Sequence, residues 1–125
     1  NIEGDFLVAS GAGFGIGSTS DNLEGAIAGE NYEIEQMYPS FHLVAKDQQE
    51  NDAIRSFHYA LEAEKIHSTL YSEAKDAVDA GRDYDMEYVS ICEVCGHTVK
   101  DDTPENCPIC GAPKENFKEF NSYDD

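Results

Sequence analysis

Residues 53–78 read AIRSFHYALEAEKIHSTLYSEAKDAV, and this stretch decides the fold class. One series in it advances by alternating steps of four and three residues, which is the spacing of one face of an α-helix. The series is Ala53, Phe57, Ala60, Glu64, His67, Tyr71, Ala74 and Val78. Its middle is occupied by a glutamate and a histidine. Since an unpaired buried carboxylate is strongly destabilising, a core-facing helix with this pattern requires a nearby positive charge.

An earlier stretch has the same pattern with the same kind of interruption. Its series is Leu23, Ile27, Glu30, Ile34, Met37, Phe41 and Val44. Glu33 adds a further carboxylate, one turn beyond Glu30. The simplest source of positive charge between two such helices is a metal cluster. Glu64 and His67 are three residues apart and share a helix face. Carboxylate and imidazole ligands suit iron or manganese.

The two series predict an antiparallel helix pair. We expect the first helix to be capped by Thr19, to run to about Asp47 and to be kinked at Pro39. A proline inside a helix costs roughly 3 kcal/mol unless neighbours compensate. The polar residues 47–51 form a short turn, and the second helix ends near Gly81, a residue type that commonly stops helices.

Composition excludes several classes of function. The chain has 26 acidic and 8 basic residues, a net charge of −18, which argues against nucleic-acid and anionic-membrane binding. No apolar run reaches the roughly 18 residues of a membrane span, and we expect no basic, apolar, cleavable leader. The glycine-rich residues 1–18 lack the spacing of a dinucleotide or phosphate loop and are expected to be a connector.

The four cysteines predict a second metal site. They form two Cys-x-x-Cys pairs separated by eleven residues: Cys92, Cys95, Cys107 and Cys110. This spacing is typical of a tetrahedral tetrathiolate site, and a module this small needs the metal to fold. Zinc would make the module structural, whereas iron would make it a one-electron carrier. Reduced thiols also favour a cytoplasmic location.

Several motifs, taken in order, resemble the rubrerythrin family. They are Gly29-Glu30-Asn31-Tyr32-Glu33, Met37-Tyr38-Pro39-Ser40-Phe41, Ala63-Glu64-Lys65-Ile66-His67 and, after the cysteine pairs, Pro113-Lys114-Glu115-Asn116-Phe117. The resemblance implies a mainly α protein. Residues 19–81 would form half of a ferritin-like four-helix bundle, and residues 82–125 a rubredoxin-like domain.

The resemblance also implies a role for each site residue. Glu64 would bridge the two irons of a di-iron centre, Glu30 and His67 would bind one of them, and Glu33 would bind the other in one redox state. The four cysteines would bind a mononuclear iron, with zinc as the alternative. Tyr38 lies two turns beyond Glu30 and either hydrogen-bonds a ligand carboxylate or is an ordinary core tyrosine.

Rubrerythrins reduce hydrogen peroxide to water with electrons from a donor protein, passed through the rubredoxin-type iron. The bundle of the family has four helices, so further ligands would come from a longer polypeptide, a second polypeptide or a second copy in a homodimer. The resemblance implies an antiparallel dimer, because the two centres of one subunit are expected to be far apart. Two alternatives remain open: an interaction module without redox chemistry, and iron oxidation in the manner of ferritin.

Overall fold

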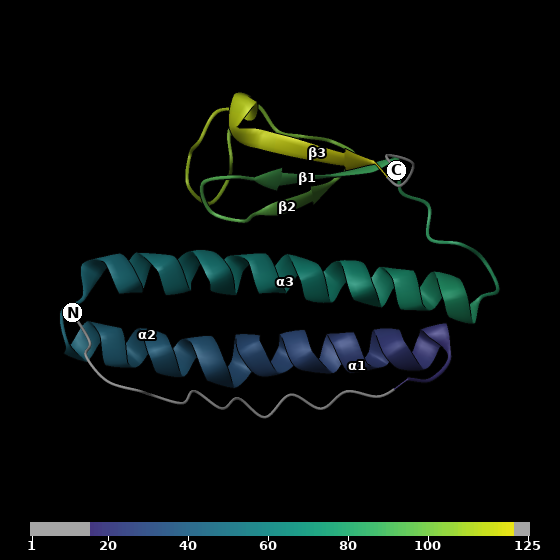
Figure 1. The fold of residues 1–125 in the computed structure, drawn as a ribbon, viewed down its shortest axis with the longest axis horizontal. Coiled ribbons are helices and arrows are strands. Elements are labelled where there is room, and N and C mark those ends of the chain that lie inside the picture. The colour runs from purple at the N-terminus through teal and green to yellow at the C-terminus, as the bar shows by residue number, and fades with distance from the viewer. Residues whose placement is uncertain (1–15, 122–125) are drawn as a thin grey trace.

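The computed structural model describes residues 16–121. Most of the predicted connector, including its glycine pattern, lies outside these residues. Three segments form one helical rod: α1 (Thr19–Tyr32), the π-helical segment η1 (Glu33–Met37) and α2 (Tyr38–Asp47). Helix α3 (Asn51–Asp79) returns alongside this rod (Figure 1). The predicted antiparallel helix pair is therefore confirmed.

The ends of the helices follow from local hydrogen bonding. Ser18, and not Thr19, caps α1: its hydroxyl accepts from the Asp21 backbone N–H at 3.2 Å, and the Asp21 carboxylate accepts from the Ser18 N–H at 2.9 Å. This reciprocal pair is a capping box, and it makes Thr19 the first helical residue. Gly81 follows α3 with φ +69°, the left-handed conformation that commonly ends a helix.

Segment η1 replaces the predicted kink at Pro39. The Tyr38 N–H donates to the Glu33 carbonyl, five residues back, and Pro39 stands in the first turn of α2. Proline lacks an N–H and so cannot donate a helical hydrogen bond. The wider π turn accommodates the missing bond, and the helical rod continues past Pro39. The Ser40 hydroxyl donates to the Gln36 carbonyl at 2.6 Å, which satisfies one acceptor of the wide turn.

The π turn also shifts which residues face α3. The predicted series places Val44 inward, but Val44 is 53% exposed whereas Ala45 is 4% exposed. A π turn uses one more residue than an α turn, so the inward face of α2 moves by one position. Phe41 and Tyr71 of the two series are also exposed. They are exposed because each of the two helices in the described part of the chain packs against only one other helix, which leaves part of its apolar face open to solvent.

A small antiparallel sheet follows the helices. Its strands are β1 (Tyr88–Cys92), β2 (Thr98–Lys100) and β3 (Phe117–Asn121), in the order β2-β1-β3. A short 3-10 helix, η2 (Lys114–Asn116), precedes β3. The sheet lies on the side of α3 that faces away from α1 and α2 (Figure 1). No helix within residues 16–121 is long and apolar enough to cross a membrane.

Candidate metal centres

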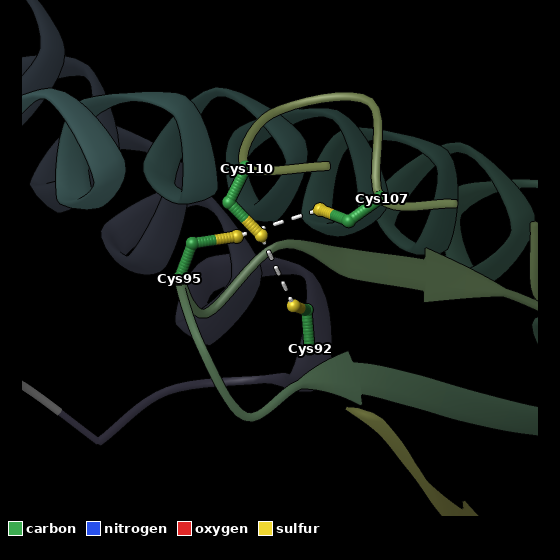
Figure 2. Close-up of side chains that lie close together, drawn as sticks. All are labelled: Cys92, Cys95, Cys107 and Cys110. Carbon is green, nitrogen blue, oxygen red and sulfur yellow. Dashed lines mark hydrogen bonds between the residues drawn. The ribbon is translucent and has the colours of Figure 1, made fainter. Parts of the chain in front are cut away.

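The four cysteines converge on one point from two loops (Figure 2). The Sγ atoms of Cys92 and Cys110 are 3.6 Å apart, and those of Cys95 and Cys107 are 3.5 Å apart. A tetrahedral ion with metal–sulfur bonds of about 2.3 Å requires sulfur–sulfur distances of about 3.8 Å. The four thiols therefore need to move apart only slightly to enclose an ion, so the donor set fits a mononuclear tetrathiolate metal.

Each cysteine pair is built on the same backbone turn. The Gly96 N–H donates to the Cys92 carbonyl at 2.8 Å, and the Gly111 N–H donates to the Cys107 carbonyl at 2.9 Å. Both glycines have φ +77°, a conformation that side chains with a Cβ rarely adopt. The glycines therefore close the two turns that aim the thiols inward.

The helical residues predicted as ligands also meet in space. Glu30 lies in the last turn of α1, while Glu64 and His67 stand one turn apart on α3, and one donor atom from each lies within 4.8 Å of the others. His67 Nδ1 is 2.7 Å from Glu64 Oε2 and 3.8 Å from Glu30 Oε1. Both carboxylates are 15% exposed. Two largely buried carboxylates and one imidazole nitrogen are thus directed at a common point.

The electrostatics of this cluster fit a bound cation. Glu30 Oε2 is buried without a hydrogen-bond partner. Burial, followed by repulsion from the Glu64 carboxylate, raises the pKa of Glu30 to about 7. A metal ion would supply the missing partner and the missing charge, and carboxylate plus imidazole donors suit iron or manganese.

Glu33 begins the π turn and Tyr38 directly follows it, and both lie near the Glu64 carboxylate. Burial raises the pKa of Glu33, and repulsion from Glu64 adds to the shift. Burial and the charge of Glu64 likewise raise the pKa of the Tyr38 hydroxyl. Tyr38 therefore keeps its proton at neutral pH. Its ring also packs at 6.3 Å from Phe41 and 6.4 Å from Phe57, between centroids.

Comparison with known proteins identifies the family. The rubrerythrin family model matches residues 12–75, and the model of the rubrerythrin rubredoxin-like domain matches residues 91–118. The chain belongs to the rubrerythrin family. Its four cysteines are the mononuclear iron or zinc site of a rubredoxin-like domain.

Curated relatives and solved structures agree with this assignment. Rubrerythrin-2 of Clostridium acetobutylicum is 49% identical over 116 residues, which cover 93% of this chain and 63% of that protein. Nigerythrin of Nitratidesulfovibrio vulgaris is 34% identical, over 79% of this chain and 48% of that protein. A structure of fully reduced, all-ferrous nigerythrin matches with TM-score 0.75 at 31% identity, over 92% of this chain and 55% of the other. The chain thus spans 48% to 63% of the length of these relatives.

In this rubrerythrin-family chain the two candidate metal centres are neighbours. Tyr59 of α3 packs against the buried cysteine cluster, and a Cβ added to Gly96 would lie 3.9 Å from Cβ of Ala63. The side chain of Thr98, in β2, reaches His67 on α3. The expectation that the two centres of one chain are far apart is therefore wrong for this structure, because the linker after α3 folds the cysteine module back along that helix.

Two features of the site were missed by sequence reasoning. Periodicity assumes 3.6 residues per turn, so it could not find η1; Pro39, two residues after the segment, was the available signal. Thr98 gave no signal, because its contact with α3 depends on how the module docks and not on any local pattern.

Proposed function

We propose that this protein is a di-iron peroxidase that reduces hydrogen peroxide to water. The balanced reaction consumes two electrons and two protons and breaks the O–O bond to give two water molecules. Iron in the helical site would supply the electrons at the bond that breaks. The rubredoxin-type iron would return them one at a time from a reduced donor protein.

The observation that carries this proposal is the cluster of Glu30, Glu64 and His67, with its unpartnered carboxylate oxygen, beside a tetrathiolate site. A cysteine module that served only for protein interaction would have no reason to lie against buried carboxylates. Membership in an oxidoreductase family and the likeness to all-ferrous nigerythrin support iron as the metal.

The roles proposed for the side chains follow the family resemblance. Glu64 would be shared by two metal positions, and Glu30 and His67 would complete one of them. Glu33, on the wide turn η1, serves the second position. Tyr38 retains its proton beside these carboxylates and can donate a hydrogen bond to one of them.

A di-iron centre needs more ligands than these. Bundles of this type use a glutamate from each of two helices and a Glu-x-x-His pair from each of two others. We propose that the remaining ligands come from further helices, contributed by a longer form of the protein, another polypeptide or a second copy. The exposed side chains of Phe41, Val44 and Tyr71 offer apolar surface for such helices.

The test is peroxide consumption by the native, iron-loaded protein with a reduced electron-donor protein. Glu64→Ala should lower turnover at least about 100-fold, because metal stabilisation of the reacting oxygens is worth several kcal/mol. Glu62→Ala, on the same helix and paired with Lys65, is the matched control and should keep turnover.

Three outcomes would contradict the proposal. Full turnover in Glu64→Ala would reject the site. A colourless protein that holds only zinc would favour an interaction module. Oxidation of ferrous iron by dioxygen, without peroxide turnover, would favour the ferritin-like alternative.

A further inference from the structure

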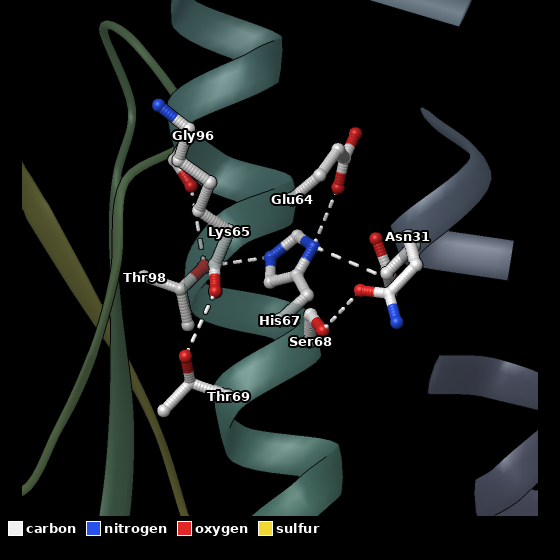
Figure 3. A network of polar contacts seen from close by, with 9 residues as sticks. Asn31, Glu64, Lys65, His67, Ser68, Thr69, Gly96 and Thr98 are labelled. Atoms are coloured by element: carbon white, nitrogen blue, oxygen red, sulfur yellow. Dashed lines mark hydrogen bonds and ion pairs between the residues drawn. The ribbon is translucent and has the colours of Figure 1, made fainter. Parts of the chain in front are cut away.

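Both ring nitrogens of His67 are engaged, and the outer one contacts the cysteine module. Nδ1 faces Glu64, whereas Nε2 is 3.0 Å from the Thr98 hydroxyl (Figure 3). That hydroxyl also donates to the Gly96 carbonyl, at 3.2 Å. One threonine side chain therefore joins a predicted metal ligand to the loop that contains Cys95.

The hydroxyl can serve this contact in two ways because it has one proton and can also accept. When its hydrogen bond goes to Gly96, the hydroxyl accepts from Nε2–H of His67, and a metal between Nδ1 and the carboxylates takes the place of the proton that the 2.7 Å contact of Nδ1 with Glu64 otherwise requires. When its proton goes to Nε2, Nδ1 carries a proton and donates to Glu64. Only the first arrangement leaves Nδ1 able to bind a metal.

We propose that Thr98 is a positioning residue that holds His67 in the metal-binding tautomer and so connects the cysteine module to the helical metal site of the same chain. This inference rests on the proposed function insofar as His67 is a ligand. It names a residue of the cysteine module, 31 positions away in sequence, as the group that orients that ligand. Groups that hydrogen-bond the second nitrogen of a metal-bound histidine fix its ring and strengthen its binding.

The position of Thr98 is fixed by its own module. Thr98 is 5% exposed, and it pairs with Ile91 of the neighbouring strand β1. The Gly96 carbonyl accepts the hydrogen bond from the Thr98 hydroxyl, and Gly96 itself closes the turn through the hydrogen bond from its N–H to the Cys92 carbonyl. A metal at the cysteines would hold this turn rigid, and the rigid turn would hold the hydroxyl in place over His67.

The experiment compares Thr98→Val, which has nearly the same shape but no hydroxyl, with Thr98→Ser, which restores it. Thr69→Val is the matched control, since Thr69 lies on α3 and donates only to the Lys65 carbonyl. The native protein is first filled with zinc at the cysteine site, and cobalt(II) is then titrated into the helical site. We expect Thr98→Val to weaken cobalt binding about 10- to 100-fold, and Thr98→Ser and Thr69→Val to bind as wild type does.

A second measurement uses the wild-type protein alone and does not depend on peroxidase activity. Nitrogen-15 NMR of His67 in the wild-type protein with zinc in both sites should show Nε2 protonated and its proton slow to exchange. Fast exchange of that proton, or unchanged cobalt affinity in Thr98→Val, would overturn the inference. Loss of zinc from the cysteine site in Thr98→Val would mark a folding failure, and the wild-type NMR result then decides.

These results are separable from the proposed function. A wild-type protein that binds cobalt at the helical site with the expected tautomer, but does not reduce peroxide, would reject the peroxidase and leave Thr98 in its role. Peroxidase activity with unchanged cobalt binding in Thr98→Val would support the peroxidase and reject the role of Thr98.

Discussion

At the scale of single residues, Glu30 is the most informative side chain of the helical site. It has one carboxylate oxygen near His67 and another that is buried without a partner. The pKa of the Glu30 carboxyl group is raised from 4.5 to about 7, by burial first and by the Glu64 carboxylate second. The group therefore keeps its proton to a higher pH than an exposed glutamate does. In the metal-free protein, the second carboxylate oxygen of Glu30 is therefore buried without a partner, and a bound metal would supply that partner.

The first prediction concerns the pH dependence of the metal-free protein. Because the pKa of Glu30 is higher in the folded than in the unfolded state, its contribution is fully present below about pH 4.5 and is lost as pH rises through 7. The free energy of unfolding should fall relative to Glu30→Gln by at most about 3 kcal/mol between pH 5 and 8. Urea unfolding at several pH values measures this difference.

The exposed Glu35→Gln is the control for this series and should follow the wild type at every pH. A difference between wild type and Glu30→Gln that does not change with pH would contradict the prediction, and so would one that changes with the opposite sign.

At the scale of elements, the π turn η1 sets the register between the two halves of the helical rod. It lies between Glu30 at the end of α1 and Tyr38 at the start of α2. Its extra residue rotates α1 relative to α2 by about 100° compared with an uninterrupted α-helix. This rotation lets Glu30 face His67 while Ala45 is buried against α3.

The second prediction follows from this register. Deletion of Glu35, an exposed residue of η1, should convert the wide turn to an ordinary α turn and rotate Glu30 away from Glu64 and His67. Metal analysis should find the helical site empty and the cysteine site still occupied. Glu35→Ala, which keeps the residue count, should retain both metals, and metal in both sites of the deletion variant would refute the argument.

Local periodicity was enough for part of the structure. The helix pair, the inward position of Glu30, Glu64 and His67, and the convergence of the cysteines all follow from spacing within one element or one pair of turns. The prediction of Val44 as an inward residue failed, because the series counts every turn as 3.6 residues. The contact between Thr98 and His67 could not be predicted, since it depends on the docking of a separate module.

At the scale of the whole molecule, the cysteine module depends on its metal and on α3. Its buried core consists of Cys92, Cys95 and Cys107, with Tyr59 of α3 against them. Burial raises the pKa of the Cys95 thiol in the metal-free protein. The metal therefore stabilises both the sheet and its docking on the helix.

The third prediction is that Cys107→Ser unfolds the module and leaves the helices intact. Tetrathiolate metal sites contribute about 10–16 kcal/mol to the folding of small modules, far more than three short strands supply. Circular dichroism should retain the helical signal while NMR shifts of β1, β2 and β3 collapse. The exposed Glu93→Ser is the control, and a dispersed sheet spectrum in Cys107→Ser would reject metal-dependent folding.

The linker after α3 holds the module on its own helix through Tyr84. The Tyr84 hydroxyl donates to Glu73 of α3, and Lys100 Nζ of β2 lies 4.2 Å from the centroid of the Tyr84 ring. Burial, followed by the bond to Glu73, raises the pKa of Tyr84, so the hydroxyl keeps its proton. One side chain thus contacts both α3 and the sheet.

The last prediction separates these two contacts. Tyr84→Phe keeps the ring under Lys100 but loses the bond to Glu73, whereas Tyr84→Ala loses both. A hydrogen bond to a charged group contributes about 1.5–3 kcal/mol and an exposed cation–π contact about 0.5–1 kcal/mol, so docking should weaken in the order wild type, Phe, Ala. Proteolysis of residues 82–87 and hydrogen exchange at Thr98 should speed up in that order, while the metal at the cysteines stays bound. Equal protection in all three proteins would show that Tyr59, Ala63 and Thr98 hold the module on α3 without help from the linker.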